Sequence, residues 1–271
     1  MKLIASALGV LLISSASAGD DVATRIENAM NGDHRSAEYI ARNQYRHPVE
    51  TLTFFGLEDG MTVLEIWPGG GWYTEVLAPT MHDHGKLLVA GYDVSVPGQP
   101  EYRYDLQKRL LRKFEERPDL YDQVEVVPFS PPQSASLGDA DTIDMVVTFR
   151  NTHNWIRADM AEGMFAEFYR VLKPGGVLGV VQHRAPAGSD PDETVRSGYV
   201  PERYLIEVAE AAGFEYEEHS QVNANPKDSK DHPEGVWTLP PSLRLGDKDR
   251  DKYLAIGESD RMTLRFRKPK D

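Results

Sequence analysis

A short run of polar side chains in the middle of the sequence has the residue types that acid–base chemistry uses. Arg150, Asn151 and His153 follow directly after the apolar stretch 143–149. An imidazole can serve as a general base near neutral pH, and a guanidinium can bind an acidic group. The amide of Asn151 could orient a substrate, and Trp155 could shelter it. The alternative is that the polar groups only satisfy loop backbone and that Trp155 is core, so both interpretations stay open.

A second histidine, His183, follows the next apolar stretch at 177–181. If the two apolar stretches form neighbouring parallel strands, their carboxyl ends share one edge of the sheet, and His183 would lie near His153. Two imidazoles could begin a metal site, but the sequence offers no evident third ligand. We therefore expect no metal.

The strongest local pattern is a glycine turn that follows the expected strand at 61–67. Residues Gly69–Gly71 allow close approach of the backbone to a ligand, and the helix after them offers free N–H groups. Asp93 ends the next expected strand, where a carboxylate can accept hydrogen bonds from ribose hydroxyls. A nicotinamide dinucleotide is disfavoured, because its fingerprint needs a glycine where this chain has Thr74.

The rest of the sequence alternates short apolar stretches with amphipathic stretches of helical length. This alternation is typical of βαβ units, and it predicts an α/β fold on a mostly parallel sheet with both faces covered. The helix that begins at residue 72 is expected to stop at Pro79. Strands are expected at 61–67, 86–90, 123–129, 143–149, 177–181, from 214 onward and at 261–267, and helices at 21–31, 35–46, from 48 onward, and at 72–78, 102–116, 160–172 and 201–212.

The composition excludes several classes of protein. The chain has 271 residues, 43 of them acidic and 30 basic, which gives a formal net charge of −13. Such a chain is a poor binder of nucleic acid, whose affinity rests on Lys and Arg neutralising phosphates. The absence of cysteine excludes disulfide scaffolds, cysteine-ligated zinc and cysteine nucleophiles.

The first residues have the three-part pattern of a secretory signal peptide. Lys2 supplies a positive start, residues 3–13 form an apolar run, and a small-residue cleavage site ends at Ala18. The run is too short to span a bilayer, and no later stretch is apolar for long enough to do so. We therefore expect residues 1–18 to be removed and the protein to be periplasmic or secreted, without a membrane anchor.

A helical segment precedes the expected sheet domain, which spans residues 61–271. Residues 19–60 are expected to form a lid in which Arg42 and Arg46 fold over the ligand pocket. The alternative is that these charged side chains form the wet face of a helix.

A polar, turn-rich stretch at 223–260 interrupts the domain before its last strand. It contains several prolines and has the character of an insertion rather than a separate domain. Long stretches of this kind are usually either functional or disordered. His232 and Trp237 in this stretch either line a pocket or have structural roles.

Taken together, these motifs resemble the class I S-adenosylmethionine-dependent methyltransferases. The resemblance covers about residues 40–222 and 261–267, and it rests on Glu65 with the glycine turn, on Asp93 and on the turn at 168–176. It implies a Rossmann-like α/β fold with a mostly parallel seven-stranded sheet, helices on both faces and an antiparallel last strand. It also implies that the loop after the fourth strand lies over the cofactor's methyl group. The residues expected to bind S-adenosylmethionine are Glu65, Trp67, Gly69, Gly70, Gly71 and Asp93, and those expected to take part in catalysis are Arg150, Asn151, His153 and His183.

The chain departs from the family pattern at two positions. Trp67 stands where the family usually has glycine, so its indole either crowds the methionine part of the cofactor or points away and packs between helices. The third strand ends at 127–130 without the acidic residue that often contacts the adenine amine. Over its full length, the chain looks like a group of predicted secreted bacterial methyltransferases to which no substrate is assigned.

Two functions are consistent with these observations. The first is methyl transfer from S-adenosylmethionine to a small-molecule or protein acceptor by an exported enzyme. Because S-adenosylmethionine is made in the cytosol, such an enzyme needs a supply of it outside. The second is a non-enzymatic periplasmic protein that binds a nucleoside or another small ligand on the same fold.

Overall fold

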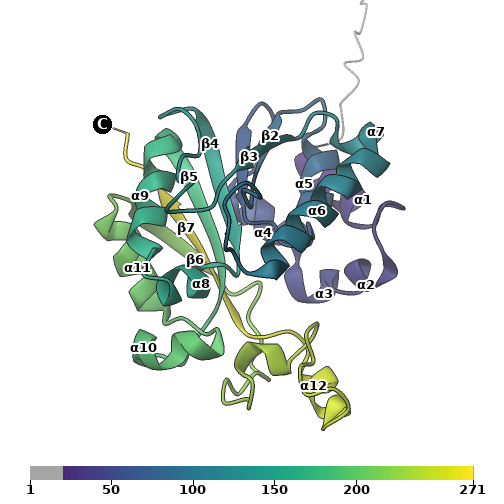
Figure 1. The fold of residues 1–271 in the computed structure, drawn as a ribbon, viewed down its shortest axis with the longest axis vertical. Coiled ribbons are helices and arrows are strands. Elements are labelled where there is room, and N and C mark those ends of the chain that lie inside the picture. The colour runs from purple at the N-terminus through teal and green to yellow at the C-terminus, as the bar shows by residue number, and fades with distance from the viewer. Residues whose placement is uncertain (1–20, 271) are drawn as a thin grey trace, which may run out of the picture.

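Seven strands form one mixed sheet in the computed structural model, which describes residues 21–270 (Figure 1). Their order across the sheet is β3-β2-β1-β4-β5-β7-β6. β7 runs antiparallel to both of its neighbours, and the other strands run parallel to one another. The expected α/β fold with an antiparallel last strand is therefore confirmed. The strands are β1 (Thr62–Ile66), β2 (Lys86–Gly91), β3 (Glu125–Pro128), β4 (Ile143–Phe149), β5 (Leu172–His183), β6 (Glu215–Ser220) and β7 (Arg261–Arg267).

Helices cover both faces of this sheet (Figure 1). They are α1 (Val22–Met30), α2 (Ala37–Ile40), α3 (Asn43–Arg46), α4 (Pro48–Phe55), α5 (Thr74–Met81), α6 (Glu101–Glu116), α7 (Pro118–Tyr121), α8 (Thr152–Arg157), α9 (Ala161–Val171), α10 (Pro191–Thr194), α11 (Glu202–Ala211) and α12 (Arg250–Ile256), with short 3₁₀ helices η1 (Val195–Ser197) and η2 (Gly235–Thr238). Successive strand residues point to opposite faces. Val63 therefore packs with α1, α4 and α5, whereas Leu64 packs with α9 and α11. This double burial explains the near-continuous apolar stretches of the central strands.

The helix after the glycine turn continues past the proline that was expected to end it. α5 contains Pro79 in its interior. A proline has no N–H to donate to the carbonyl four residues earlier, which here belongs to Glu75. Nε2 of His34 lies 2.8 Å from that carbonyl oxygen. The expected stop at Pro79 was wrong, because a side chain from the N-terminal segment supplies the hydrogen bond that the proline lacks.

The N-terminal segment contributes to the core as well as to the edge of the sheet. Ile26 of α1 and Leu52 of α4 are completely buried. The single helix expected at 35–46 is divided into α2 and α3. Arg46 is only 1% exposed. The alternative that placed Arg46 on a wet helix face is therefore wrong.

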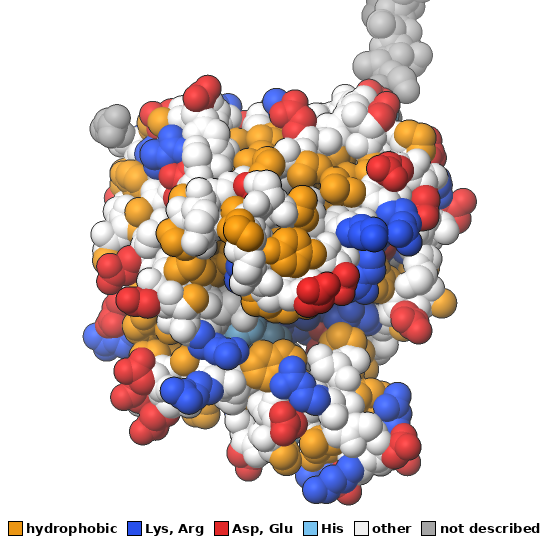
Figure 2. All heavy atoms as spheres, in the orientation of Figure 1, with side chains coloured by type: hydrophobic (Ala, Val, Ile, Leu, Met, Phe, Trp, Pro, Cys, Tyr) orange, Lys and Arg blue, Asp and Glu red, His pale blue; other side chains and the backbone are white. Residues whose placement is uncertain are grey.

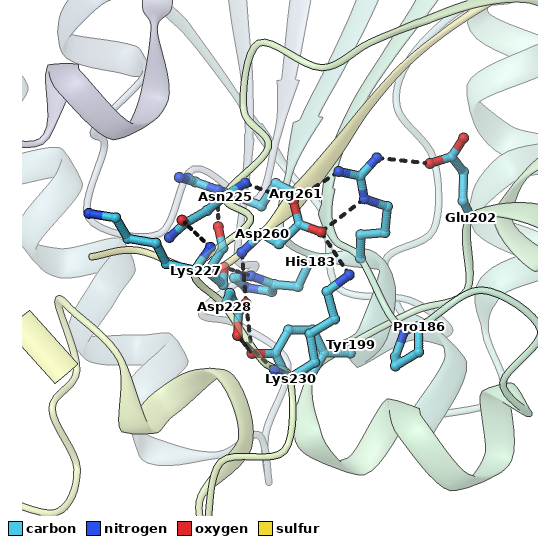
Figure 3. Close-up of polar contacts among 12 residues, drawn as sticks. His183, Pro186, Tyr199, Glu202, Asn225, Lys227, Asp228, Lys230, Asp260 and Arg261 are labelled. Atoms are coloured by element: carbon cyan, nitrogen blue, oxygen red, sulfur yellow. Dashed lines mark hydrogen bonds and ion pairs between the residues drawn. The ribbon is translucent and has the colours of Figure 1, made fainter. Parts of the chain in front are cut away.

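The insertion at 223–260 is held against the ends of β5 and β7 by buried carboxylates (Figure 3). Asp228 accepts hydrogen bonds from the Tyr199 hydroxyl at 2.9 Å and from the backbone N–H of Asp260 at 2.7 Å. Asp260 in turn pairs with Arg184 at 2.9 Å. Because each carboxylate has several donors, the insertion is fixed beside the carboxyl edge of the sheet.

The predicted signal peptide, residues 1–18, lies outside the described residues. Within residues 21–270, no helix is long and apolar enough to cross a membrane. Export therefore stays a prediction.

Candidate functional site

The carboxyl edge of the sheet carries a cleft of about 730 Å³. The exits of β1, β4 and β5 line it, and so do α6, the N-terminal segment and the insertion. In Figure 2 this region is a hollow with histidine at its floor and Lys and Arg side chains along its rim. Volumes of about 300–1,000 Å³ are typical of sites for small molecules and cofactors.

Two of the three glycines of the turn line the cleft. Gly69 and Gly70 lie in its wall, whereas a side chain on Gly71 would meet Leu110 of α6. Gly69 has a φ of 60°, and apart from its two chain neighbours no described residue has an atom within 4 Å of the place where its Cβ would be. The next residue, Gly70, accepts a hydrogen bond at its carbonyl oxygen from the Tyr39 hydroxyl at 3.2 Å. The turn thus presents bare backbone to the cleft at Gly69, which close approach of a ligand requires.

Glu65 lies in β1 and is not part of the cleft lining. Its carboxylate accepts a hydrogen bond from the Thr74 hydroxyl, at the start of α5, at 2.6 Å. Burial raises the pKa of Glu65 to about 7. In this arrangement Glu65 joins β1 to α5 across the glycine turn, and its contact with a cofactor stays a prediction.

The indole of Trp67 packs into the edge of the sheet. The residue lines the cleft but is only 3% exposed, and its Nε1 donates to the carbonyl oxygen of Phe129 at 3.0 Å. Its ring centroid lies 5.1 Å from that of Tyr92 and 6.0 Å from that of Trp155. The indole is thus packed, as in the second alternative, but Trp67 still lines the cleft, and its contact with a cofactor stays a prediction. Its φ of 45° lies in the left-handed region, which agrees with the glycine that the family usually has at this position.

Asp93 follows β2 and lies outside the cleft lining. One of its carboxylate oxygens accepts hydrogen bonds from the N–H and the hydroxyl of Ser95, at 2.9 and 2.6 Å. These hydrogen bonds lower the pKa of Asp93. Its backbone N–H donates to the Ser130 hydroxyl at 2.9 Å, so the exit of β3 supports the exit of β2. The ribose contact expected of Asp93 stays a prediction.

Asn151 ties the exits of β4 and β1 together. Its Nδ2 donates to the carbonyl oxygens of Ile66 at 2.9 Å and Trp67 at 3.2 Å. The side-chain oxygen of Asn151 accepts no hydrogen bond from the rest of the described chain. The amide therefore positions the loop after β4 against the glycine turn and keeps one acceptor for a ligand.

The structure brings His153 and His183 together in the cleft wall. Their ring centroids are 5.7 Å apart. Burial lowers the pKa of His153 to about 4. Burial, with His153 and Arg150 nearby, also lowers the pKa of His183 well below its ordinary value, so both rings are neutral at pH 7. Within the described residues, no group of three or more His, Cys, Asp or Glu side chains is placed to hold a metal ion.

Sequence analysis missed Gln182, which determines the tautomer of His153. Nε2 of Gln182 donates to the carbonyl of Gly198 at 3.0 Å, and this fixes the orientation of the amide. The same nitrogen lies 3.2 Å from Nδ1 of His153, so Nδ1 accepts and the ring carries its hydrogen on Nε2. Nδ1 of His183 lies 2.5 Å from the hydroxyl of Ser259, which can donate or accept. The position of Gln182 directly before His183 was the only sequence signal for it.

A buried carboxylate, also missed by sequence analysis, holds the arginines of the N-terminal segment. Oε1 of Glu258 lies 2.6 Å from Nε of Arg42, and Oε2 lies 3.2 Å from Nε of Arg46. Oε2 also lies 3.0 Å from Nη1 of Arg261. Burial favours the neutral acid, but these guanidinium groups and that of Arg150 outweigh it and hold the pKa of Glu258 well below its ordinary value. The N-terminal segment is thus fastened to the cleft.

The remaining candidates divide between the cleft and its supports. Trp237 lines the cleft, with its ring centroid 5.7 Å from that of His153. His232 lies away from the cleft, with Nε2 2.8 Å from Asp228. Arg184, which follows His183 in the sequence, pairs with the insertion instead of lining the cleft.

The fold and the place of the cleft are those of a known class of protein. A glycine turn after β1 that opens onto a cleft at the carboxyl edge of this sheet is the arrangement of the class I methyltransferases, whose cofactor is S-adenosylmethionine. Residues 64–180 match the family model described as "Methyltransferase domain". The match therefore covers the part of the chain that carries the glycine turn and β4.

Solved structures of methyltransferases share this fold. A SAM-dependent methyltransferase from Aquifex aeolicus matches with a TM-score of 0.54 and 16% identity, over 91% of this chain and 98% of that one. Phosphoethanolamine N-methyltransferase 2 of Haemonchus contortus, in complex with S-adenosyl-L-methionine, matches with a TM-score of 0.56 and 16% identity, over 91% and 57% of the two chains. The [4+2]-cyclase SpnF matches with a TM-score of 0.55 and 17% identity, over 92% and 93%. Comparison with curated proteins found no significant sequence match.

Proposed function

We propose that this protein transfers a methyl group from S-adenosylmethionine to a small-molecule or protein acceptor. The observation that carries the proposal is the bare backbone of Gly69, which opens onto the cleft inside the methyltransferase domain. A glycine turn at this place allows the backbone to approach a nucleoside and its amino-acid arm. The acceptor is then bound between the loop after β4 and the insertion.

The residues of the cleft fit this cofactor. Gly69 and Gly70 offer backbone contacts, and Tyr102 and Phe149 add aromatic surface to the lining. The volume of about 730 Å³ has room for a nucleoside and a small acceptor together. Ser95 occupies only one carboxylate oxygen of Asp93, so the other oxygen can accept a hydrogen bond from a ribose hydroxyl.

The side chains after β4 and β5 orient the acceptor and receive its proton. When bound, the cofactor supplies an electrophilic methyl group on a sulfonium. His153 carries its hydrogen on Nε2 and so acts as a hydrogen-bond donor to the acceptor. His183 can receive the proton when Ser259 accepts its Nδ1–H and leaves Nε2 free, although its lowered pKa makes it a weak base. Oδ1 of Asn151 is available to hold a donor group of the acceptor.

Calorimetric titration with S-adenosylhomocysteine, the product form of the cofactor, tests the cofactor site. We expect the wild-type protein to bind it and Gly69→Ala to weaken binding at least about tenfold, because a methyl group would project into the cleft. Gly98→Ala is the matched control. Gly98 also has a positive φ, 77°, and open space around its Cβ, but it lies outside the cleft lining.

Absence of binding to the folded wild-type protein would reject the proposal. It would then favour the second candidate, a binding protein for another small ligand on the same fold. The burial of Trp67 between the exits of β1 and β3 is the observation that supports this alternative. Mass spectrometry of ligands that co-purify with the protein separates the two functions.

We also propose that the protein is exported. Lys2, the apolar run at 3–13 and the cleavage site that ends at Ala18 support this. We expect protein recovered from the producing cells to lie outside the cytosol and to begin at Gly19. N-terminal sequencing of the protein in each cell fraction checks this, and an intact N-terminus on a cytosolic protein would contradict it.

A further inference from the structure

The cleft is rich in positive charge, although the chain as a whole is acidic. The formal net charge of the sequence is −13. Among the described residues that line the cleft, the Lys, Arg, Asp and Glu side chains are Arg42, Arg103, Arg150, Arg157, Arg244 and Glu258. Acidic residues outnumber basic ones in the sequence, but Glu258 is the only acidic residue in the described lining of the cleft.

Several of these arginines form no direct ion pair with a carboxylate of the described residues. Arg150 and Arg157 form no ion pair with any residue of the described chain. Arg103 lies over the ring of Trp67, 4.9 Å from its centroid, instead of beside a carboxylate. A guanidinium group without a carboxylate partner offers charged N–H donors to a ligand that enters the cleft.

Beside Glu258, positive charge is buried in excess. Four arginines surround this one carboxylate: Arg42, Arg46, Arg150 and Arg261. Nη1 and Nη2 of Arg46, Nη2 of Arg42 and Nε of Arg150 are buried and have no hydrogen-bond partner in the described part of the chain. Burial lowers the pKa of Arg150 to about 10, which still leaves it protonated at neutral pH. Buried charges and donors are normally paired, so this arrangement calls for an anion.

The charge of the cofactor makes this requirement stronger. S-adenosylmethionine has a sulfonium, an ammonium and a carboxylate group, so it is a net cation, and an arginine-rich cleft opposes its binding. We propose that the methyl acceptor is a small anion with carboxylate or phosphate groups, bound among Arg42, Arg150 and Arg157. Guanidinium groups match the geometry of both kinds of anion. This inference rests on the proposed function and names the chemical class of its acceptor.

The carboxylate of the cofactor does not account for all of these arginines. A single guanidinium can satisfy one carboxylate by a bidentate pair. The arginines of the cleft come from separate walls: Arg42 from the N-terminal segment, Arg157 from α8 and Arg244 from the insertion. An acceptor that itself carries negative charge would account for the arginines on each of these three sides of the cleft.

Titration of small anions into the protein saturated with S-adenosylhomocysteine tests the proposal. The probes are inorganic phosphate and malonate, added at constant ionic strength maintained with sodium chloride. We expect at least one probe to bind and both Arg150→Gln and Arg157→Gln to weaken it at least about tenfold. Arg157 is exposed, so its variant tests the proposal even if Arg150→Gln fails to fold. Arg203→Gln is the matched control, because this side chain is 88% exposed and pairs with Glu207 outside the cleft.

A second measurement uses the charge difference between the two forms of the cofactor. A bound anion should raise the affinity for S-adenosylmethionine more than that for S-adenosylhomocysteine, because only the former has the sulfonium charge. Absence of probe binding, or equal binding by wild type and Arg157→Gln, would overturn the proposal. Displacement of S-adenosylhomocysteine by malonate would also overturn it, since the arginines would then hold the cofactor's own carboxylate. If S-adenosylhomocysteine does not bind at all, the proposed function fails. The anion titrations are then repeated on the free protein, so that the anion site is tested separately from the cofactor site.

Discussion

Two glutamates near the cleft are almost completely buried, yet their surroundings give them opposite tendencies to ionise. Glu65 accepts one hydrogen bond from Thr74, and burial raises its pKa to about 7. Glu258 is in contact with three guanidinium groups, which hold its pKa well below the ordinary value in spite of burial. The comparison shows that the partners of a buried carboxylate, more than its depth, decide its charge.

The two carboxylates also support different parts of the cleft. Glu65 belongs to the region that matches the methyltransferase family model, and it braces the glycine turn through α5. Glu258 lies outside that region and fastens Arg42 and Arg46 of the N-terminal segment. A hydrogen bond to Thr74 thus stabilises the glycine turn, whereas ion pairs hold the N-terminal segment at the side of the cleft.

Removal of the charge of Glu258 should have the largest effect on stability. Glu258→Gln leaves the buried Arg46 and Arg261 and the partly buried Arg42 without their carboxylate, and we expect a loss of about 3–5 kcal/mol in the free energy of unfolding. Glu234→Gln is the control, because Glu234 is half exposed and lies 3.6 Å from Arg244. Exposed pairs are worth at most about 1 kcal/mol. Urea unfolding measures both, and equal small losses would show that Glu258 is not the fastening point.

Removal of the charge of Glu65 should act in the opposite direction and depend on pH. The folded protein keeps a proton on Glu65 that the unfolded chain releases, so wild-type stability falls as pH rises from 4.5 to about 7. Glu65→Gln removes this dependence while Thr74 still donates to the amide oxygen. Above pH 7 the variant should be more stable than wild type by roughly 3 kcal/mol. Thermal unfolding between pH 5 and pH 8 checks the sign, and parallel curves for the two proteins would contradict the raised pKa.

A smaller effect is expected where the glycine turn is joined to the loop after β4. Asn151→Ala removes the donor to the carbonyls of Ile66 and Trp67, which should cost about 1–3 kcal/mol and weaken binding of S-adenosylhomocysteine. Asn154→Ala is a matched control from the same loop, because Asn154 lines the cleft and its side chain has no hydrogen bond within the described chain. Urea unfolding and calorimetric titration of both variants separate the effect of the Asn151 hydrogen bonds from the effect of removing a side chain that only lines the cleft. Similar losses of stability and binding for the two variants would contradict this role of the Asn151 hydrogen bonds.

The parts of the fold that depend on local pattern could be predicted from the sequence. The predicted strands at 143–149 and 261–267 have the observed bounds of β4 and β7, because apolar runs and alternation are local signals. The meeting of His153 and His183 followed from the rule that parallel strands end at one edge. These successes needed no knowledge of distant contacts.

The features that sequence analysis missed depend on residues far apart in the chain. His34 supports the helix through Pro79 from a position 41 residues before Glu75, whose carbonyl it contacts. Glu258 lies 212 residues from Arg46. No local sequence pattern marks His34 or Glu258. A buried ion pair, or a side chain that replaces a helix hydrogen bond, forms only when distant parts of the chain come together on folding.

The contacts of Glu258 also have a consequence for the order of events during synthesis. Arg42 and Arg46 emerge early from the ribosome, but their carboxylate follows 216 and 212 residues later. β7 comes last and still takes a place between β5 and β6. A nascent chain therefore carries these arginines without their carboxylate until Glu258 has been translated. The cleft is completed only after Glu258 has been made, whereas strands β1 to β5 can already pair with one another before that point.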